Sequence, residues 1–245
     1  MKRFLILGLP IVIAGCDEIH INRGHNIGGP RIQGNGKPKE ESRTVAEYDK
    51  VIVGSSFEVV ASEGSLAPLK ISADSNILHQ IKTEVKDRVL KVWIEGNITT
   101  SSPLKLALST PKINDLEASG AAKVNLSLQS KHNLKLGGSG ASDIDVKGEV
   151  NNLECNLSGA SKAVLATQSL TALNTTLSGA SSLDFKGSVD SLDAELSGAS
   201  SIKGGMHGNR AKVRMSGAST SYLGKFTNVD KESSGGSSVS FAGDE

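Results

Sequence analysis

The apolar and polar positions in the second half of the chain repeat with a nearly fixed period. The four-residue motif Ser-Gly-Ala-Ser, or a close variant of it, begins at Ser119, Ser139, Ser158, Ser178, Ser197, Ser216 and Ser234. Successive copies start 18 to 20 residues apart, and such a period is typical of stacked repeat architectures. The pattern therefore predicts a solenoid.

Apolar residues occupy alternate positions on both sides of each motif. Positions one, three and five before the first serine are mostly apolar, and so are positions five and seven after it. A period of two predicts two strands per coil, each with one buried side. The column three residues before the serine contains Leu116, Leu136, Cys155, Thr175, Ala194, Val213 and Lys231.

Stacked coils of this kind bring parallel strands to about 4.8 Å from one another. Since crossovers between parallel strands are nearly always right-handed, we predict an all-β, right-handed parallel β-helix with about 19–20 residues per coil. The motif itself would form a corner, in which glycine allows a positive φ, alanine fills the narrow space, and the serines hydrogen-bond along the stack.

The repeats occupy residues 113–245, and the segment 44–112 before them is also predicted to be β-structure. It contains alternating runs separated by Gly and Pro, with one short helical turn expected within Ser75–Lys82, and we interpret it as continuous with the solenoid. At the other end, Lys231 and Ser233 replace apolar residues in the core columns. This change predicts a C-terminal cap from about residue 230.

The N-terminus has the pattern of a bacterial lipoprotein signal. Residues 1–15 contain a cationic start, a short apolar stretch and two small residues, which is typical of a secretory signal and too short for a permanent span. Ile13-Ala14-Gly15-Cys16 resembles a lipobox, in which the cysteine thiol receives a diacylglycerol. We therefore predict lipidation at Cys16.

Residues 16–43 are rich in Gly and contain few apolar residues, so they are predicted to form a flexible tether between the lipid and the folded body. The folded body is expected outside the cytoplasm, in the bacterial cell envelope. Asp17 resembles a signal for retention in the inner membrane, but that rule varies among bacteria, and the sequence leaves the choice of membrane and leaflet open.

Composition narrows the classes of function. Aromatic residues make up only 3% of the chain, and 27 Lys and Arg nearly balance 26 Asp and Glu, so no basic footprint for nucleic acid is present. The second cysteine, Cys155, falls on the apolar side of an alternating strand and is therefore predicted to be a buried structural residue. Trp93 lies in an apolar alternating run and is predicted to be buried.

No constellation of catalytic, cofactor-binding or metal-binding residues is evident in the sequence. Asp143 with Asp145, and Asp193 with Glu195, fall on the same side of their strands, but such pairs are typical of solvent-facing alternation. The five histidines lack the spacing of metal ligands. We expect no enzymatic activity, no cofactor and no metal.

Several stretches resemble the bacterial "putative auto-transporter adhesin" family with a head GIN domain. They are Tyr48-Asp49-Lys50-Val51-Ile52-Val53-Gly54, Phe57-Glu58-Val59, Leu90-Lys91-Val92 after Asn76-Ile77-Leu78, and Thr110-Pro111 leading into Leu116-Glu117-Ala118-Ser119-Gly120. The resemblance covers roughly Glu47 to Gly224. It implies one β-helix-like domain on an exported, often lipid-anchored protein, and it brings no catalytic residues.

The sequence thus predicts a non-enzymatic, membrane-anchored lipoprotein of the cell envelope that presents a β-helical surface for adhesion or binding. Its partners would be the membrane, through the N-terminal lipid, and an envelope protein or glycan. Two alternatives remain open: a polysaccharide lyase or hydrolase on the same fold, and an envelope scaffold or signalling partner.

Overall fold

The computed structural model describes residues 30–242, which are almost entirely β-structure with one short 3-10 helix, η1 (Leu78–Gln80). This helix lies within the predicted helical turn. The strands are β1 (Ile32–Gln33), β2 (Pro38–Arg43), β3 (Lys50–Val53), β4 (Phe57–Glu63), β5 (Leu69–Asp74), β6 (Ile81–Lys86), β7 (Val89–Ile94), β8 (Ile98–Thr99), β9 (Leu104–Thr110), β10 (Asp115–Ala118), β11 (Lys123–Ser127), β12 (His132–Gly138), β13 (Asp143–Lys147), β14 (Val150–Leu157), β15 (Lys162–Leu177), β16 (Ser182–Leu196), β17 (Ser201–Lys203), β18 (Gly208–Met215), β19 (Thr220–Leu223), β20 (Phe226–Ser233) and β21 (Ser238–Phe241).

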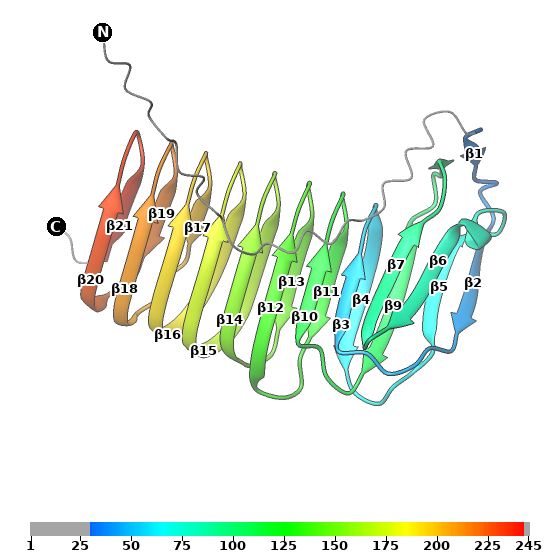
Figure 1. Ribbon diagram of the computed structural model, residues 1–245, viewed down its shortest axis with the longest axis horizontal. Coiled ribbons are helices and arrows are strands. Elements are labelled where there is room, and N and C mark those ends of the chain that lie inside the picture. Colours follow the sequence, from blue (N-terminus) through cyan, green and yellow to red (C-terminus); the bar gives the residue numbers. More distant parts are fainter. Residues whose placement is uncertain (1–29, 243–245) are drawn as a thin grey trace, which may run out of the picture.

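The strands form two long ladders that lie back to back (Figure 1). We name them face A and face B, and the long strands β15 and β16 contribute to both. In spatial order, face A contains β6, β7, β3, β10, β12, β14, β15, β16, β18 and β20. Face B contains β2, β5, β9, β4, β11, β13, β15, β16, β17, β19 and β21.

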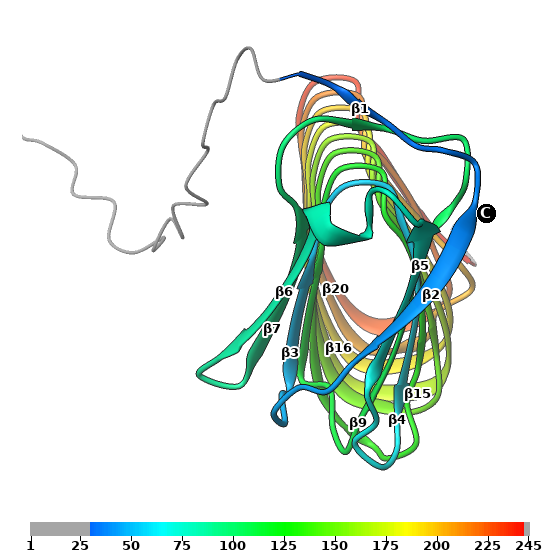
Figure 2. The same ribbon diagram turned by 90° about the vertical axis from the view of Figure 1, so that its right-hand side faces the viewer.

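The solenoid is right-handed and its coils stack in parallel, as predicted. Seen from the end that holds β2 and β6, the chain rises along face A and descends along face B while the coils recede, which is a clockwise path (Figures 1 and 2). The predicted core columns are in register: Leu136 pairs with Cys155, and Cys155 with Thr175. Cys155 is fully buried, and burial raises the pKa of its thiol to about 12.

Each Ser-Gly-Ala-Ser motif forms a corner, but the roles of its residues differ from the prediction. The alanine is exposed, and the second serine is buried instead, as at Ser161 and Ser181. The Ser181 hydroxyl donates to the carbonyl oxygen of Ser178 at 2.9 Å, and Ser142 donates to Ser161 at 3.2 Å. The buried serines therefore close each turn and in places link neighbouring coils.

The corner glycine is required for two reasons. Gly179 has φ of +73°, and a Cβ atom there would lie 2.6 Å from the carbonyl oxygen of Gly159 in the preceding coil. That carbonyl accepts a hydrogen bond from the backbone N–H of Ala180 at 2.7 Å. The same bond recurs at the corners of the neighbouring coils, so glycine allows both the turn and the close approach.

The first coils stack out of sequence order. On face A, β3 lies between β7 and β10, and on face B, β4 lies between β9 and β11. The coil of β3 and β4 is therefore enclosed between an outer coil, formed later in the chain by β7 and β9, and the repeats. The pairs β2–β5, β5–β9 and β6–β7 are antiparallel, so this end departs from the regular β-helix.

The predicted tether is wrong in its last part, because residues 38–43 form β2. This strand pairs with β5 from Pro38–Asp74 to Arg43–Leu69. Arg43 also donates from Nη1 to the carbonyl oxygen of Ile81 at 2.6 Å. Residues 38–43 are thus ordered by pairing with a strand that is distant in the sequence, which the local Gly-rich composition does not indicate. Residues 1–29, which include the predicted signal, Cys16 and the first half of the predicted tether, lie outside the described residues.

The last coil continues both ladders and ends the stack. β20 pairs with β18, and β21 pairs with β19. Val229, Lys231 and Ser233 occupy the core columns of β20 but are exposed, since no later coil covers them. Lys231 Nζ lies 5.8 Å from the centre of the Phe241 ring, where its charge and stem cover part of the open end.

A buried carboxylate joins three segments at the corner opposite the Ser-Gly-Ala-Ser turns. Glu63, only 2% exposed, accepts hydrogen bonds from the backbone N–H groups of Ile113 at 3.0 Å, Gln129 at 3.0 Å and Ser130 at 3.2 Å. Its Oε1 also contacts His132 Nε2 at 2.5 Å. Burial alone would raise the pKa of Glu63, but these bonds outweigh it and hold the pKa below its usual value.

The corner geometry predicts a selective effect of added methyl groups. Gly179→Ala should lower the free energy of unfolding by roughly 2 kcal/mol or more, because alanine is strained at positive φ and its Cβ meets the Gly159 carbonyl oxygen. Gly205→Ala is the matched control, since nothing lies within 4 Å of the point that its new methyl group would occupy, and it should change stability by less than about 0.5 kcal/mol. Urea unfolding measures both, and equal stabilities would contradict the assigned role of glycine.

The Glu63 contacts predict that removing the carboxylate lowers the free energy of unfolding and makes that free energy less sensitive to acid. Glu63→Gln should cost about 3 kcal/mol, because it removes the charge from a buried pair and turns an amide N–H₂ toward backbone donors. In the native protein the carboxylate stabilises the fold above the unfolded pKa of about 4.5, and this contribution is lost as the pH falls through the lower folded pKa.

Chemical unfolding at pH 7 and across the acid range measures this effect. Glu58→Gln is the control, since Glu58 lies on the same strand with an exposed side chain, and it should change stability by less than about 0.5 kcal/mol. A Glu63→Gln protein as stable as the control at pH 7 would show that the carboxylate does not hold the three segments together.

Candidate functional site

The outer surface of face A carries charges that are mostly paired across neighbouring strands. Lys50 Nζ lies 2.9 Å from Asp115 Oδ2 and also contacts Glu117, and Lys135 Nζ lies 2.9 Å from Glu154 Oε1. Burial raises the pKa of Asp115 in spite of its contact with Lys50. The side chains of this row, from β3 to β20, are Lys50, Asp115, Lys135, Glu154, Asn174, Asp193, Lys212 and Asp230.

The two carboxylate pairs noted in the sequence are not brought together with each other. Asp143, on face B, stands between Lys123 and Lys162 in the strand register. Asp193 and Glu195 lie on face A, where both contact Arg214. The two pairs thus occupy different faces. Among the residues the structure describes, no group of three or more His, Cys, Asp or Glu side chains could hold a metal ion.

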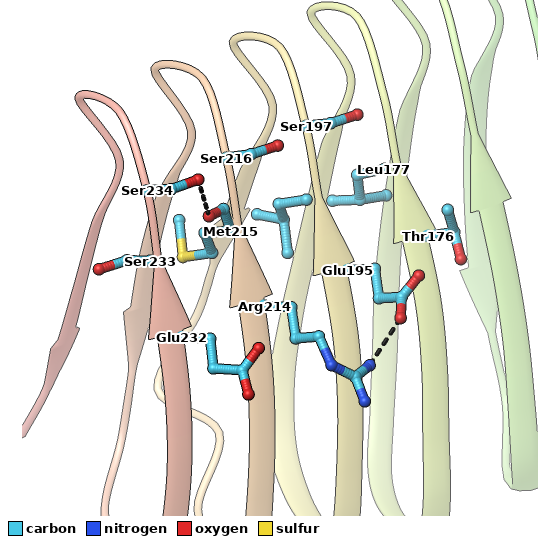
Figure 3. Close-up of a pocket in the computed structure, with 11 residues that line it drawn as sticks. Thr176, Leu177, Glu195, Ser197, Arg214, Met215, Ser216, Glu232, Ser233 and Ser234 are labelled. Carbon is cyan, nitrogen blue, oxygen red and sulfur yellow. Dashed lines mark hydrogen bonds and ion pairs between the residues drawn. The ribbon is translucent and has the colours of Figure 1, made fainter. Parts of the chain in front are cut away.

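A shallow hollow of about 450 Å³ surrounds Arg214 on face A (Figure 3). Arg214 Nη1 lies 2.6 Å from Glu195 Oε1, and Glu232 lies on the other side of Arg214, on β20. The first serines of three corners line its upper edge, and they are Ser197, Ser216 and Ser234. The hollow offers hydroxyl groups and charges of both signs, which suit polar contacts with a ligand.

A second hollow, of about 580 Å³, lies beside Trp93 near the other end of the stack. The prediction that Trp93 is buried is wrong, because the residue is 39% exposed. In β7, Leu90 and Val92 point into the core, so strict alternation turns Trp93 outward with Lys91. Lys91 lies two residues before Trp93 and so shares its side of the strand. This polar neighbour was the signal in the sequence that could have revealed the exposure of Trp93.

The lining of the Trp93 hollow is mainly polar. Lys82 on β6 is the direct cross-strand neighbour of Trp93, and its Nζ forms an ion pair with Glu95 Oε2 at 3.2 Å. The complete lining consists of Arg43, His79, Ile81, Lys82, Thr83, Glu84, Trp93 and Glu95. An exposed indole ring beside several hydrogen-bonding groups is a common arrangement in ligand sites.

A third hollow, of about 640 Å³, is lined by amide side chains at the lower corner of face A. Asn152 Nδ2 donates to Asn133 Oδ1 at 2.9 Å, and Asn114 and Asn174 lie on the same lining with Lys112. The strand register shifts between His132 and Leu134, which leaves Asn133 on the surface. These side chains satisfy one another in part and form a polar surface, whose lining includes His132 but no Phe, Trp or Tyr.

No helix in residues 30–242 is long and apolar enough to cross a membrane. The predicted lipidation site, Cys16, falls outside that range.

Solved structures of bacterial proteins share this fold. A "putative adhesin" from Bacteroides fragilis is 16% identical, with a TM-score of 0.77 over 86% of this chain and 99% of its own. A "putative adhesin" from Parabacteroides distasonis is 20% identical, with a TM-score of 0.72 over 86% of this chain and 100% of its own. A "putative lipid binding protein" from the same species is 19% identical, with a TM-score of 0.71 over 86% of this chain and 99% of its own.

Among curated proteins, none matches this chain. The family model described as "Putative auto-transporter adhesin, head GIN domain" matches residues 47–244, which include all seven corners and every strand from β3 to β21. The chain therefore belongs to the auto-transporter adhesin family with a head GIN domain, as its sequence stretches predicted.

Proposed function

We propose that this protein is a lipid-anchored binding module of the bacterial cell envelope, with its β-helical body outside the cytoplasm. The observation that carries the proposal is the combination of a lipobox-like sequence ending at Cys16 with an adhesin-family solenoid in one chain. The lipid would hold one end of the chain in the membrane, and the solenoid would present its faces to an envelope protein or a glycan.

The lipid anchor is supported by the arrangement of residues before Cys16. A cationic start, an apolar stretch and small residues before the cysteine suit export followed by cleavage. Each buried CH₂ of an acyl chain contributes about 0.8 kcal/mol to membrane binding, and more than one chain is needed for stable attachment. A diacylglycerol on the Cys16 sulfur would meet that requirement.

A binding role is supported by the surfaces that the fold presents. The ladders hold side chains about 4.8 Å apart along rigid strands, so a ligand would meet polar groups in fixed positions and little ordering would be required on binding. Structural neighbours described as "putative adhesin" share the fold, and the carboxylates of Asp143 and Glu195 lie on separate faces. These features favour recognition of a ligand over polysaccharide cleavage.

The lipid anchor predicts that labelling depends on one of the two cysteines. Cells that express the full chain and receive a clickable palmitate analogue should incorporate the label into the wild-type protein and lose it in Cys16→Ser. Cys155→Ala is the matched control, because Cys155 is buried in the core and its replacement should leave the label in place.

Mass spectrometry of the membrane fraction completes the test. We expect a mature N-terminus at Cys16 that carries diacylglycerol, and accumulation of unprocessed chain when globomycin is present. An unmodified Cys16 on an otherwise mature chain, or full labelling of Cys16→Ser, would overturn the lipoprotein assignment.

A further inference from the structure

Trp93 has a feature that the fold does not require. Its ring is 39% exposed, while the neighbouring Val92 and Leu90 supply the apolar contacts of β7 with the core. We infer that the hollow beside Trp93 binds one uncharged pyranose ring of a glycan, an inference that rests on the proposed function as a binding module.

The hollow combines an aromatic surface with hydrogen-bonding groups around it. A pyranose ring has an apolar face of C–H groups and a rim of hydroxyl groups, so it can stack on an indole while its hydroxyl groups reach polar neighbours. Here Lys82 lies directly across from Trp93, Glu95 pairs with Lys82 at 3.2 Å, and Glu84 lines the same hollow.

The wall of the hollow is fixed in place before any ligand binds. Arg43 donates to the carbonyl oxygens of Ile81 at 2.6 Å and Leu78 at 3.1 Å, and its Nε donates to Glu41 at 2.6 Å. These bonds attach β2 to η1 and to the start of β6, which pairs with β7 along its whole length. A wall held by backbone contacts lowers the ordering cost of binding.

The charges of the lining favour an uncharged ligand. Arg43 and Lys82 are balanced by Glu84 and Glu95, so an anionic or cationic sugar would meet one repulsive pair for each attractive one. A volume of about 580 Å³ lies within the range of small-ligand sites. It exceeds what one sugar ring fills, which leaves space for further sugar units of the glycan.

The same lining argues against a protein partner at this position. Protein interfaces are depleted of Lys, Glu and Asp, whereas Lys82, Glu84 and Glu95 all line this hollow. Around Trp93 the described lining contains one aliphatic side chain, Ile81, which is buried. The β6–β7 hairpin stands at the end of the stack (Figure 2), where the end of a glycan chain can approach from outside the rod.

Trp93 is the only tryptophan in the chain, so its fluorescence reports on this hollow alone. The folded mature protein is titrated with maltotriose, cellotriose, triacetylchitotriose and mannotriose at millimolar concentrations. We expect a saturable change in emission with at least one of them. Calorimetry with that saccharide should then show binding weakened about tenfold or more in Trp93→Ala and much less in Trp93→Phe.

Tyr222→Ala is the matched control, because Tyr222 is a 58% exposed ring on face B. This variant should bind the saccharide with the affinity of the wild type. Circular dichroism checks that each variant is folded, and Glu84→Gln provides a second variant that should also weaken binding. Unchanged emission with all four saccharides, unchanged affinity in Trp93→Ala, or an emission change that only an envelope protein produces would each overturn the inference.

The failure of this inference is distinguishable from failure of the proposed function. Lipid labelling at Cys16 does not depend on Trp93, and binding of the mature protein to whole cells is measured separately from saccharide binding. If both persist while the saccharides have no effect, the binding module stands and the glycan site at Trp93 does not.

Discussion

The structure depends on one short contact that recurs at each Ser-Gly-Ala-Ser corner. The backbone N–H of the alanine donates to the glycine carbonyl oxygen of the preceding coil at 2.6–2.7 Å between Gly120 and Ala218. Only glycine permits both the positive φ and this approach, since a Cβ atom would lie 2.5–2.6 Å from that oxygen. The corners therefore set the coil spacing, and both ladders and all core columns follow from it.

The end formed by the first coils must be covered, because a regular stack would leave two open strand edges there. The antiparallel strands β2, β5 and β6 cover this end, and Glu63 joins segments that the corner motif does not reach. Departure from the repeat also creates the Trp93 hollow. Regular coils thus provide rigidity, while the irregular end provides the more distinctive chemical surface.

The sequence predicted the repeats well because their buried columns recur at a fixed period. Cys155 could be placed in the core from its neighbours, and the right-handed path follows from the general behaviour of parallel crossovers. The enclosed coil of β3 and β4 could not be predicted, because its partners β7 and β9 are chosen by long-range pairing. The strand at residues 38–43 was missed for the same reason. The exposure of the corner alanines was missed because the packing of a corner depends on the next coil.

Amide hydrogen exchange at the corners tests the central constraint most directly. The backbone N–H groups of Ala141, Ala160, Ala180, Ala199 and Ala218 belong to residues with exposed side chains, yet each is hydrogen-bonded to the preceding coil. The account predicts that they exchange as slowly as the core amides of the same coils, with opening free energies near that of global unfolding. Rapid exchange at these alanines, with the neighbouring strands still protected, would contradict it.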